Sequence, residues 1–265
     1  MIIRSTGYRT DLIFPMFDGR IVDRGDYLVV QTPSNPSFYW GNFLIFKDPP
    51  SQGDHLRWRR LFAEEIGHPL RTTHETLGWD SPEGTIGWVR PFLEAGFALL
   101  RNTVLAAAGL RPPPHSSRVE VRPVESEADW EQALALQVLC RDAGHAEADY
   151  RLYRRRQIRR YRAMIAAGWG RWYGAFLDGR LAGDLGIFHH EGLGRFQSVE
   201  THPDLRGRGI AGTLVYEAAH RTLAETGITS LILVAEAESP AERLYRSVGF
   251  EPIELQVGLE RWQEA

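Results

Sequence analysis

Two residue types that shape many protein sites are nearly absent from this chain of 265 residues. Cys140 is the only cysteine, which excludes an internal disulfide framework and any metal cluster built from several cysteines. Lys47 is the only lysine, so 30 of the 31 basic residues are arginine, a bias that we attribute to genome composition. No apolar run approaches the ~20 residues that span a bilayer, and the first residues lack the apolar region of a signal peptide. We therefore expect a cytoplasmic protein without a membrane partner.

A strong charge of either sign is also lacking. The net charge is −3, so no overall field favours nucleic acid or an anionic membrane. Hydrophobic residues make up 43% and charged residues 25% of the chain, as in ordinary globular proteins. The chain is long enough to bury one large core or two modest ones, so the composition predicts a folded globular protein.

A proline-rich segment divides the chain. Residues 108–117 (AGLRPPPHSS) place three consecutive prolines between a glycine and two serines. Consecutive prolines cannot continue a helix or form a central strand, so this composition is typical of an extended linker. We predict a first domain over residues 1–110, a linker over 111–118 and a second domain over 119–265.

Strands and helices alternate along the second half. Asp178-Gly179 separates two apolar runs and predicts a hairpin turn. The order β-α-α-β-β-β-α-β-α-β predicts an α/β fold around a mixed sheet. We expect strands over 119–124, 172–177, 181–188, 195–201, 230–235 and 250–260, and helices over 130–139, 149–167, 209–224 and 240–248.

The first half resembles the second. Sliding the chain on itself by 153 residues lays 43–97 on 196–250, and 11 of these 55 positions are identical. About 3–4 identities are expected by chance from ordinary composition. The order strand, turn, helix, strand, helix also agrees, so we predict two copies of one fold. The matches include Phe43 with Phe196, Pro50 with Pro203, Leu61 with Leu214, Glu64 with Glu217, Arg90 with Arg243, Gly96 with Gly249 and Phe97 with Phe250.

The strongest chemical signal is a glycine-rich turn between the strand 195–201 and the helix that follows it. Gly207 and Gly209 allow backbone conformations that other residues avoid, and they let a ligand approach the main chain. The first turn of the helix offers free N–H groups and the positive end of the helix dipole. Arg206 and Arg208 add positive charge. The turn predicts a binding site for a diphosphate, although it lacks the Lys-Ser/Thr pair of a P-loop.

These residues resemble a known superfamily. Arg206, Gly209 and Ala211 match the Arg/Gln-x-x-Gly-x-Gly/Ala core of the acetyl-CoA diphosphate loop in GCN5-related N-acetyltransferases (GNATs). Residues 241–250 (AERLYRSVGF) resemble the A-x-x-L-Y-x-x-x-G-F signature of the same superfamily. The resemblance extends over 119–260.

One departure from the superfamily pattern lies just before the second signature. Glu238 stands where many members have asparagine. An asparagine there provides one hydrogen bond on the cofactor side in those members. The departure leaves that single hydrogen bond without its usual donor in this chain, while the other matched positions are retained.

The resemblance implies two GNAT-like acyl-CoA N-acyltransferase folds in tandem, and an enzyme. The implied reaction is direct acetyl transfer from acetyl-CoA, without a metal, to the primary amine of a small molecule or peptide. Tyr245 is the implied proton donor to the thiolate, and a backbone N–H of Glu200–Thr201 would bind the oxyanion. Glu200 is the first candidate for the base and His202 the second. The implied cofactor-binding residues are Val199, Thr201, Arg206, Gly207, Arg208, Gly209, Ile210, Ala211, Gly212 and Ser239.

The first copy lacks the residues implied for diphosphate binding and for proton donation. Its corresponding loop, 48–55, has Asp48 and Asp54 where the second has arginines, and Gly53 is its only glycine. Carboxylates repel a diphosphate. Phe92 stands where Tyr245 stands and has no proton to donate. We therefore predict a degenerate first copy and a catalytic second copy.

Three alternatives remain open. Gly207, Gly209 and Gly212 also fit the G-x-G-x-x-G spacing of a dinucleotide-binding fold. The domain could bind acyl-CoA without catalysis, as a regulatory module. Residues 151–162 carry seven arginines with interleaved tyrosines, which suits either RNA binding or a solvated helix face paired with acids. The small net charge favours the solvated face and makes a nucleic-acid partner the weakest prediction.

Overall fold

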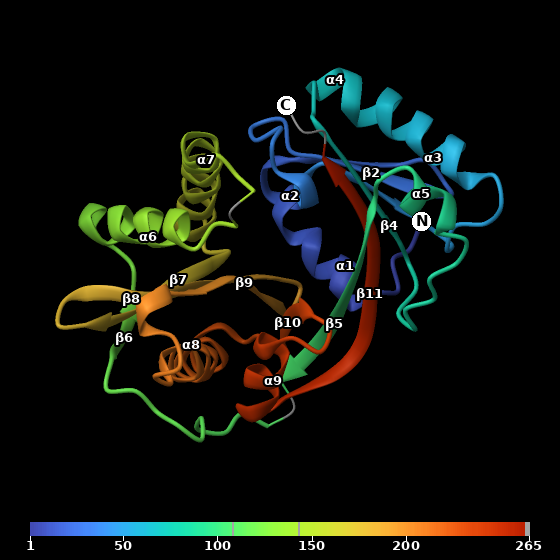
Figure 1. Cartoon of the computed structure of the whole chain (residues 1–265). Helices are drawn as coiled ribbons and strands as arrows, with labels where there is room; N and C mark the ends of the chain where they lie inside the picture. Colours follow the sequence, from blue (N-terminus) through green and yellow to red (C-terminus); the bar gives the residue numbers. More distant parts are fainter. Residues whose placement is uncertain (108, 143, 263–265) are drawn as a thin grey trace. The chain divides into compact units, whose positions relative to one another are not determined.

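The computed structural model of this chain describes residues 1–107, 109–142 and 144–262. Ala108, the first residue of the proline-rich segment, lies outside the described residues, and so do residues 263–265 of the predicted second domain. Helices and strands alternate along the described chain, as Figure 1 shows, and the predicted mixed α/β class is confirmed.

The chain forms two compact units. One consists of Met1–Val104 and the segment from Ile253, and the other of Leu105–Pro252. This division differs from the predicted domains in the last strand, β11 (Phe250–Trp262), most of which lies in the first unit. The reason is a tertiary pairing, because β11 forms an antiparallel ladder with β4 (His74–Trp79) of that unit. The predicted linker lies inside the second unit.

The second unit is built on a mixed sheet. Its strands lie in the order β10-β9-β8-β7-β6, with the end of β5 beside β10. Pairing is antiparallel from β6 through β9 and parallel between β9 and β10. A dinucleotide-binding fold requires a doubly wound parallel sheet, so that alternative is wrong. The bounds are β5 Ala98–Ala107, β6 Glu120–Pro123, β7 Gly170–Leu177, β8 Arg180–His190, β9 Leu193–Thr201 and β10 Ser230–Glu236.

Helices cover both faces of this sheet (Figure 1). Successive residues of a strand point to opposite faces. Trp172 therefore stacks with Tyr161 and packs at a tilt against Trp130, on the face of the sheet that α6 and α7 cover. The next residue, Tyr173, packs with Leu214 of α8 in the main core of the unit. The helices are α6 Glu127–Leu139, α7 Glu147–Ala166, α8 Ile210–Thr226 and α9 Pro240–Ser247.

Local sequence explains several of these boundaries. Ser126 and Asp129 form a reciprocal capping box at the start of α6. Asp178 and Gly179 both have positive φ, at +50° and +78°, as the two central residues of a type I′ hairpin turn require. The predicted hairpin between β7 and β8 is therefore confirmed.

The strands of the first unit lie in the order β1-β2-β3-β4-β11-β5. Leu44 and Phe46 of β3 pack with Trp58 of α3, whereas Phe43 and Ile45 pack with α1 on the opposite face. The elements are α1 Thr6–Asp11, α2 Ile13–Asp18, β1 Arg20–Asp23, β2 Tyr27–Gln31, β3 Phe43–Phe46, α3 Asp54–Phe62, α4 His68–Leu70 and α5 Arg90–Glu94. Short turns of other helix types cover Tyr39–Gly41 and Ala63–Gly67 in this unit and Pro203–Leu205 in the second.

The element order of the first half follows the predicted repeat. The series β3-α3-β4-α5-β5 runs in the same order as β9-α8-β10-α9-β11. The middle strands also pair alike, because β3 is parallel to β4 as β9 is parallel to β10.

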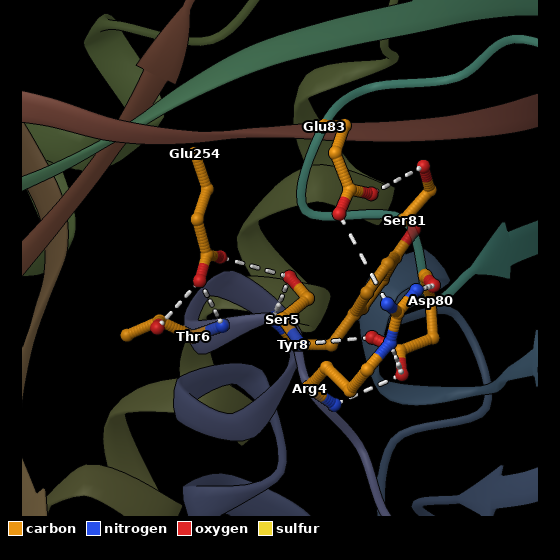
Figure 2. Close-up of polar contacts among 8 residues, drawn as sticks. All are labelled: Arg4, Ser5, Thr6, Tyr8, Asp80, Ser81, Glu83 and Glu254. Atoms are coloured by element: carbon orange, nitrogen blue, oxygen red, sulfur yellow. Dashed lines mark hydrogen bonds and ion pairs between the residues drawn. The ribbon is translucent and has the colours of Figure 1, made fainter.

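Carboxylates hold the start of α1 within the first unit (Figure 2). The Asp80 carboxylate accepts hydrogen bonds from the backbone N–H groups of Arg4 and Ser5, at 2.9 and 2.8 Å. The Glu254 carboxylate on β11 accepts from the backbone N–H and the hydroxyl of Thr6, at 2.9 and 2.7 Å. The hydrogen bonds of Glu254 therefore hold β11 in this unit, in addition to its pairing with β4.

Candidate active site

The glycine-rich turn connects β9 to α8 in the second unit. Gly207 and Gly209 both have a φ of +75°. Gly209 immediately precedes α8, and no side chain caps the helix there, so the N–H groups of the first turn are available to a ligand. Arg206 and Arg208 are exposed on the same turn, and the Arg206 Nε donates to the Thr201 carbonyl at 3.4 Å. The turn can therefore cradle an anion with backbone and side-chain donors.

Gly207, Gly209 and Gly212 differ in the atoms that surround them. A Cβ at Gly209 would lie 2.2 Å from the backbone oxygen of His115, and a Cβ at Gly212 would lie 3.0 Å from the Cβ of Pro113. The predicted linker thus packs across the start of α8, a contact that the sequence did not reveal. A Cβ at Gly207 would meet nothing within 4 Å. Substitution at Gly209 would disturb folding, whereas a side chain at Gly207 has open space around it and is restricted only by the positive φ.

A bulge opens β9 just before the turn. Gly186 pairs with Gln197 and Asp184 with Glu200, so Ser198 and Val199 together face Leu185 on β8. Ser198 has a φ of +51°, unusual for a residue with a side chain. Among the described residues, β9 and β10 pair only over the first three residues of β10, Ser230–Ile232. The later backbone of β9 is therefore left open on the β10 side.

Glu200 follows the bulge and is half-buried. Burial raises its pKa, whereas the Arg154 charge, a hydrogen bond with the Cys140 thiol and the Arg206 charge lower it. The same contact, with burial as the larger cause, raises the pKa of Cys140 to about 12, so this thiol stays protonated. A carboxylate whose pKa is raised by burial is a better base than an exposed one.

Tyr245 lies on α9 and is 6% exposed. Burial raises its pKa, and the charge of Glu200 raises it further, so the hydroxyl carries its proton at neutral pH. Ser239, a predicted cofactor-binding residue, forms the cap of the same helix and accepts from the Glu242 backbone N–H at 3.2 Å.

The predicted cofactor-binding residues fall into three groups. Those of the turn, from Arg206 to Gly212, form one continuous segment that leads into α8. The side chains of Val199 and Ile210 pack in or against the hydrophobic core, so only their backbone faces a ligand. Thr201 is half-buried at the end of β9, and Ser239 stands apart at the start of α9.

A family comparison covers the part of the chain that carries these features. Residues 173–258, which span the bulge, the glycine turn and Tyr245, match the sequence profile of the family described as FR47-like protein. The match lies mostly in the second unit and extends into β11.

Solved structures share the fold over nearly the whole chain. A functionally unknown conserved protein from Staphylococcus epidermidis ATCC 12228 has a TM-score of 0.71 at 14% identity, covering 93% of this chain and 95% of that chain. A GCN5-related N-acetyltransferase from Kribbella flavida has a TM-score of 0.66 at 15% identity, and the match covers 98% of this chain and 97% of that chain. A tandem GNAT protein from the clavulanic acid biosynthesis pathway has a TM-score of 0.53 at 16% identity, and the match covers 96% of this chain and 88% of that chain. These TM-scores show a shared fold, and no curated protein matches the sequence.

A second carboxyl group lies beside Glu200 in the second unit. Asp184 pairs with Glu200 across the strands and is completely buried. Its Oδ2 accepts hydrogen bonds from Gln137 Nε2 at 2.8 Å and Trp172 Nε1 at 3.0 Å. Its Oδ1 has no hydrogen-bond partner among the described residues. Burial raises the pKa of Asp184 to about 7, and the charge of Glu200 contributes.

The raised pKa of Asp184 predicts that the free energy of unfolding depends on pH, and that Asp184→Asn removes this dependence. Between pH 4 and 7 the folded protein holds a proton on Asp184 that the unfolded chain releases, so stability falls as pH rises. Three pKa units correspond to up to about 4 kcal/mol. We expect Asp184→Asn, which resembles the protonated acid, to gain stability relative to the wild type from pH 5 to 8 in urea unfolding. The exposed Asp204→Asn is the control, and parallel pH curves for Asp184→Asn and wild type would contradict the assignment.

The arginine-rich segment forms α7 and has two faces. Arg151 and Arg162 pair with acidic residues, Glu147 and Glu127, as the solvated-face alternative predicts. Arg154, in contrast, is only 4% exposed and points towards the β9 bulge. The helix is therefore more than a charged surface.

Two polar residues of this site were missed by the sequence reasoning. Arg154 shares a helix face with Ile158 and Tyr161, four and seven residues on, which is the spacing of buried positions. Asp184 lies inside the apolar run of β8. In both cases a charged residue at a buried position was the available signal.

The described residues contain neither a membrane-spanning helix nor a candidate metal cluster. None of the helices found there is long and apolar enough to cross a membrane. Within the same residues, no group of three or more His, Cys, Asp or Glu is placed to hold a metal ion.

Proposed function

We propose that the second unit binds acetyl-CoA and transfers its acetyl group directly to a primary amine. The observation that carries this proposal is that the bulged strand β9 leads, through the glycine turn, into the uncapped start of α8. The turn offers N–H groups and two arginines to a diphosphate, and the open strand edge beside it offers backbone groups to a thioester. The GNAT-type fold is consistent with this assignment.

The reaction requires a base, an oxyanion site and an acid. The amine attacks in its neutral form, so its proton passes to the Glu200 carboxylate directly or through water. A backbone N–H at Glu200–Thr201 donates to the carbonyl oxygen as it becomes an oxyanion. When the C–N bond has formed and the C–S bond breaks, the Tyr245 hydroxyl gives its proton to the departing thiolate.

The first unit lacks these groups at the corresponding places. Gly53 precedes α3 with a φ of +95°, as Gly209 precedes α8. The Asp54 carboxylate occupies this turn and accepts hydrogen bonds from the backbone N–H and hydroxyl of Ser51, both at 2.8 Å. Phe92 is fully buried and has no hydroxyl. We therefore propose that the first unit is a degenerate copy that binds no coenzyme.

An acceptor screen tests the proposed activity. The full chain is incubated with acetyl-CoA and a panel of polyamines, aminoglycosides, amino acids and peptides, and free thiol release is followed against the rate without acceptor. We expect at least one amine to raise thiol release and to gain one acetyl group by mass spectrometry. Acetyl-CoA binding without stimulation by any acceptor would instead support a non-catalytic acyl-CoA-binding module.

A further inference from the structure

Arg154 is a buried cation with no ion-pair partner among the residues that the structure describes. Its side chain comes from α7, and no carboxylate of the described residues lies within 4.0 Å of it. Nη1 donates to the Ser198 hydroxyl at 3.3 Å, and Nε is buried with no hydrogen-bond partner. The guanidinium carbon also lies 5.8 and 5.7 Å from the ring centres of Tyr150 and Tyr153.

This arrangement leaves both charge and hydrogen-bonding capacity unused. A guanidinium has five N–H donors, and burying it without a counter-ion is costly. Glu200 attracts it only from beyond ion-pair distance and is already engaged with Cys140. Two tyrosine rings can hold the cation in place but cannot balance its charge. A bound anion would provide the missing partner.

The position of Arg154 ties this anion to the acceptor. Its partner Ser198 is the bulge residue of β9, two residues before Glu200. The Ser198 oxygen accepts from both Arg154 and the Gln197 amide, so its own hydroxyl hydrogen is left to donate. A guanidinium and a hydroxyl therefore lie next to the strand segment at which the amine is to react.

We propose that the acceptor is an amino acid whose carboxylate is bound by Arg154 and Ser198 while its amine faces Glu200. A guanidinium binds the oxygens of carboxylates and of phosphates equally well in geometry, but a single guanidinium balances one negative charge, which favours a carboxylate over a phosphate dianion. This inference rests on the proposed function, because it names the acceptor class of the same site.

The test compares acids with their uncharged counterparts. Each of a panel of amino acids is paired with its carboxamide, and with an aminoalkyl phosphate of similar size, and kcat/KM is measured with acetyl-CoA. A charge-assisted hydrogen-bonded pair contributes about 1.5–3 kcal/mol, or roughly 10- to 150-fold. For the preferred side chain, we expect the acid to exceed its amide by such a ratio and to exceed the phosphate. In Arg154→Met this ratio falls to near one, whereas in the exposed Arg159→Met it is retained.

A binding measurement separates this inference from the proposed activity. Calorimetry with N-acetyl amino acids and their amides, which need no turnover, is expected to show carboxylate-dependent binding in the wild type that Arg154→Met abolishes. Circular dichroism checks that both variants are folded. A wild-type ratio near one, an equal ratio in Arg154→Met, or a preference for the phosphate overturns the inference even if amines are acetylated. Absence of turnover with carboxylate-dependent binding retained contradicts the proposed function instead.

Discussion

Replacing Tyr245 with phenylalanine is expected to lower acetyl transfer by about 100-fold or more while coenzyme binding survives. The change removes a hydroxyl that has no hydrogen-bond partner among the described residues and leaves the buried ring in place. Loss of an acid catalyst costs about 10²–10⁴-fold in rate. The raised pKa of Tyr245 keeps its proton available at neutral pH, so the loss should appear in kcat.

A matched control uses another tyrosine of the second unit. Tyr216→Phe on α8 removes a hydroxyl away from the bulge and should leave kcat within about twofold. Both variants are compared by thiol release at saturating acetyl-CoA and acceptor. If kcat of Tyr245→Phe equals that of the wild type, Tyr245 is a packing residue and the proton reaches the thiolate from another source.

Changing Gly207 to aspartate is expected to weaken acetyl-CoA binding by about 100-fold. The space around Gly207 is open, and both aspartate and asparagine tolerate its positive φ better than other side chains. A carboxylate about 4 Å from a diphosphate charge costs between about 1 and 4 kcal/mol, depending on screening. The asparagine variant has nearly the same shape without the charge, so it isolates the electrostatic effect.

Calorimetry at two salt concentrations provides the measurement. Gly207→Asn should bind within about tenfold of the wild type, and the additional loss in Gly207→Asp should shrink as salt rises. Equal affinities for the two variants would show that no anion lies against this turn.

Turns, helix starts and short buried strands were largely predictable from the sequence. The Asp178-Gly179 hairpin, the start of α9 at Pro240 and the glycine turn before α8 all appear where residue type restricts the backbone. The apolar runs 27–30 and 43–46 form strands β2 and β3, because short runs of such residues favour buried strands.

Tertiary partners were not predictable in the same way. The apolar pattern of β11 predicts a strand but does not show that this strand pairs with β4. Gly209 was assigned to ligand approach, yet its neighbour in the structure is the His115 carbonyl. Asp184 and Arg154 required knowledge of which strand and helix faces meet.

The central claim is that one chain binds one acetyl-CoA, at the turn before α8. Titration of the full chain with acetyl-CoA by calorimetry tests this directly when wild type, Gly207→Asp and Gly53→Asp are compared. Gly53 is a fitting control because it also has positive φ, open surroundings and a place before the corresponding helix α3. We predict one site in the wild type, one in Gly53→Asp and strongly weakened binding in Gly207→Asp. Two equivalent sites in the wild type, or a site lost in Gly53→Asp and kept in Gly207→Asp, would contradict the account.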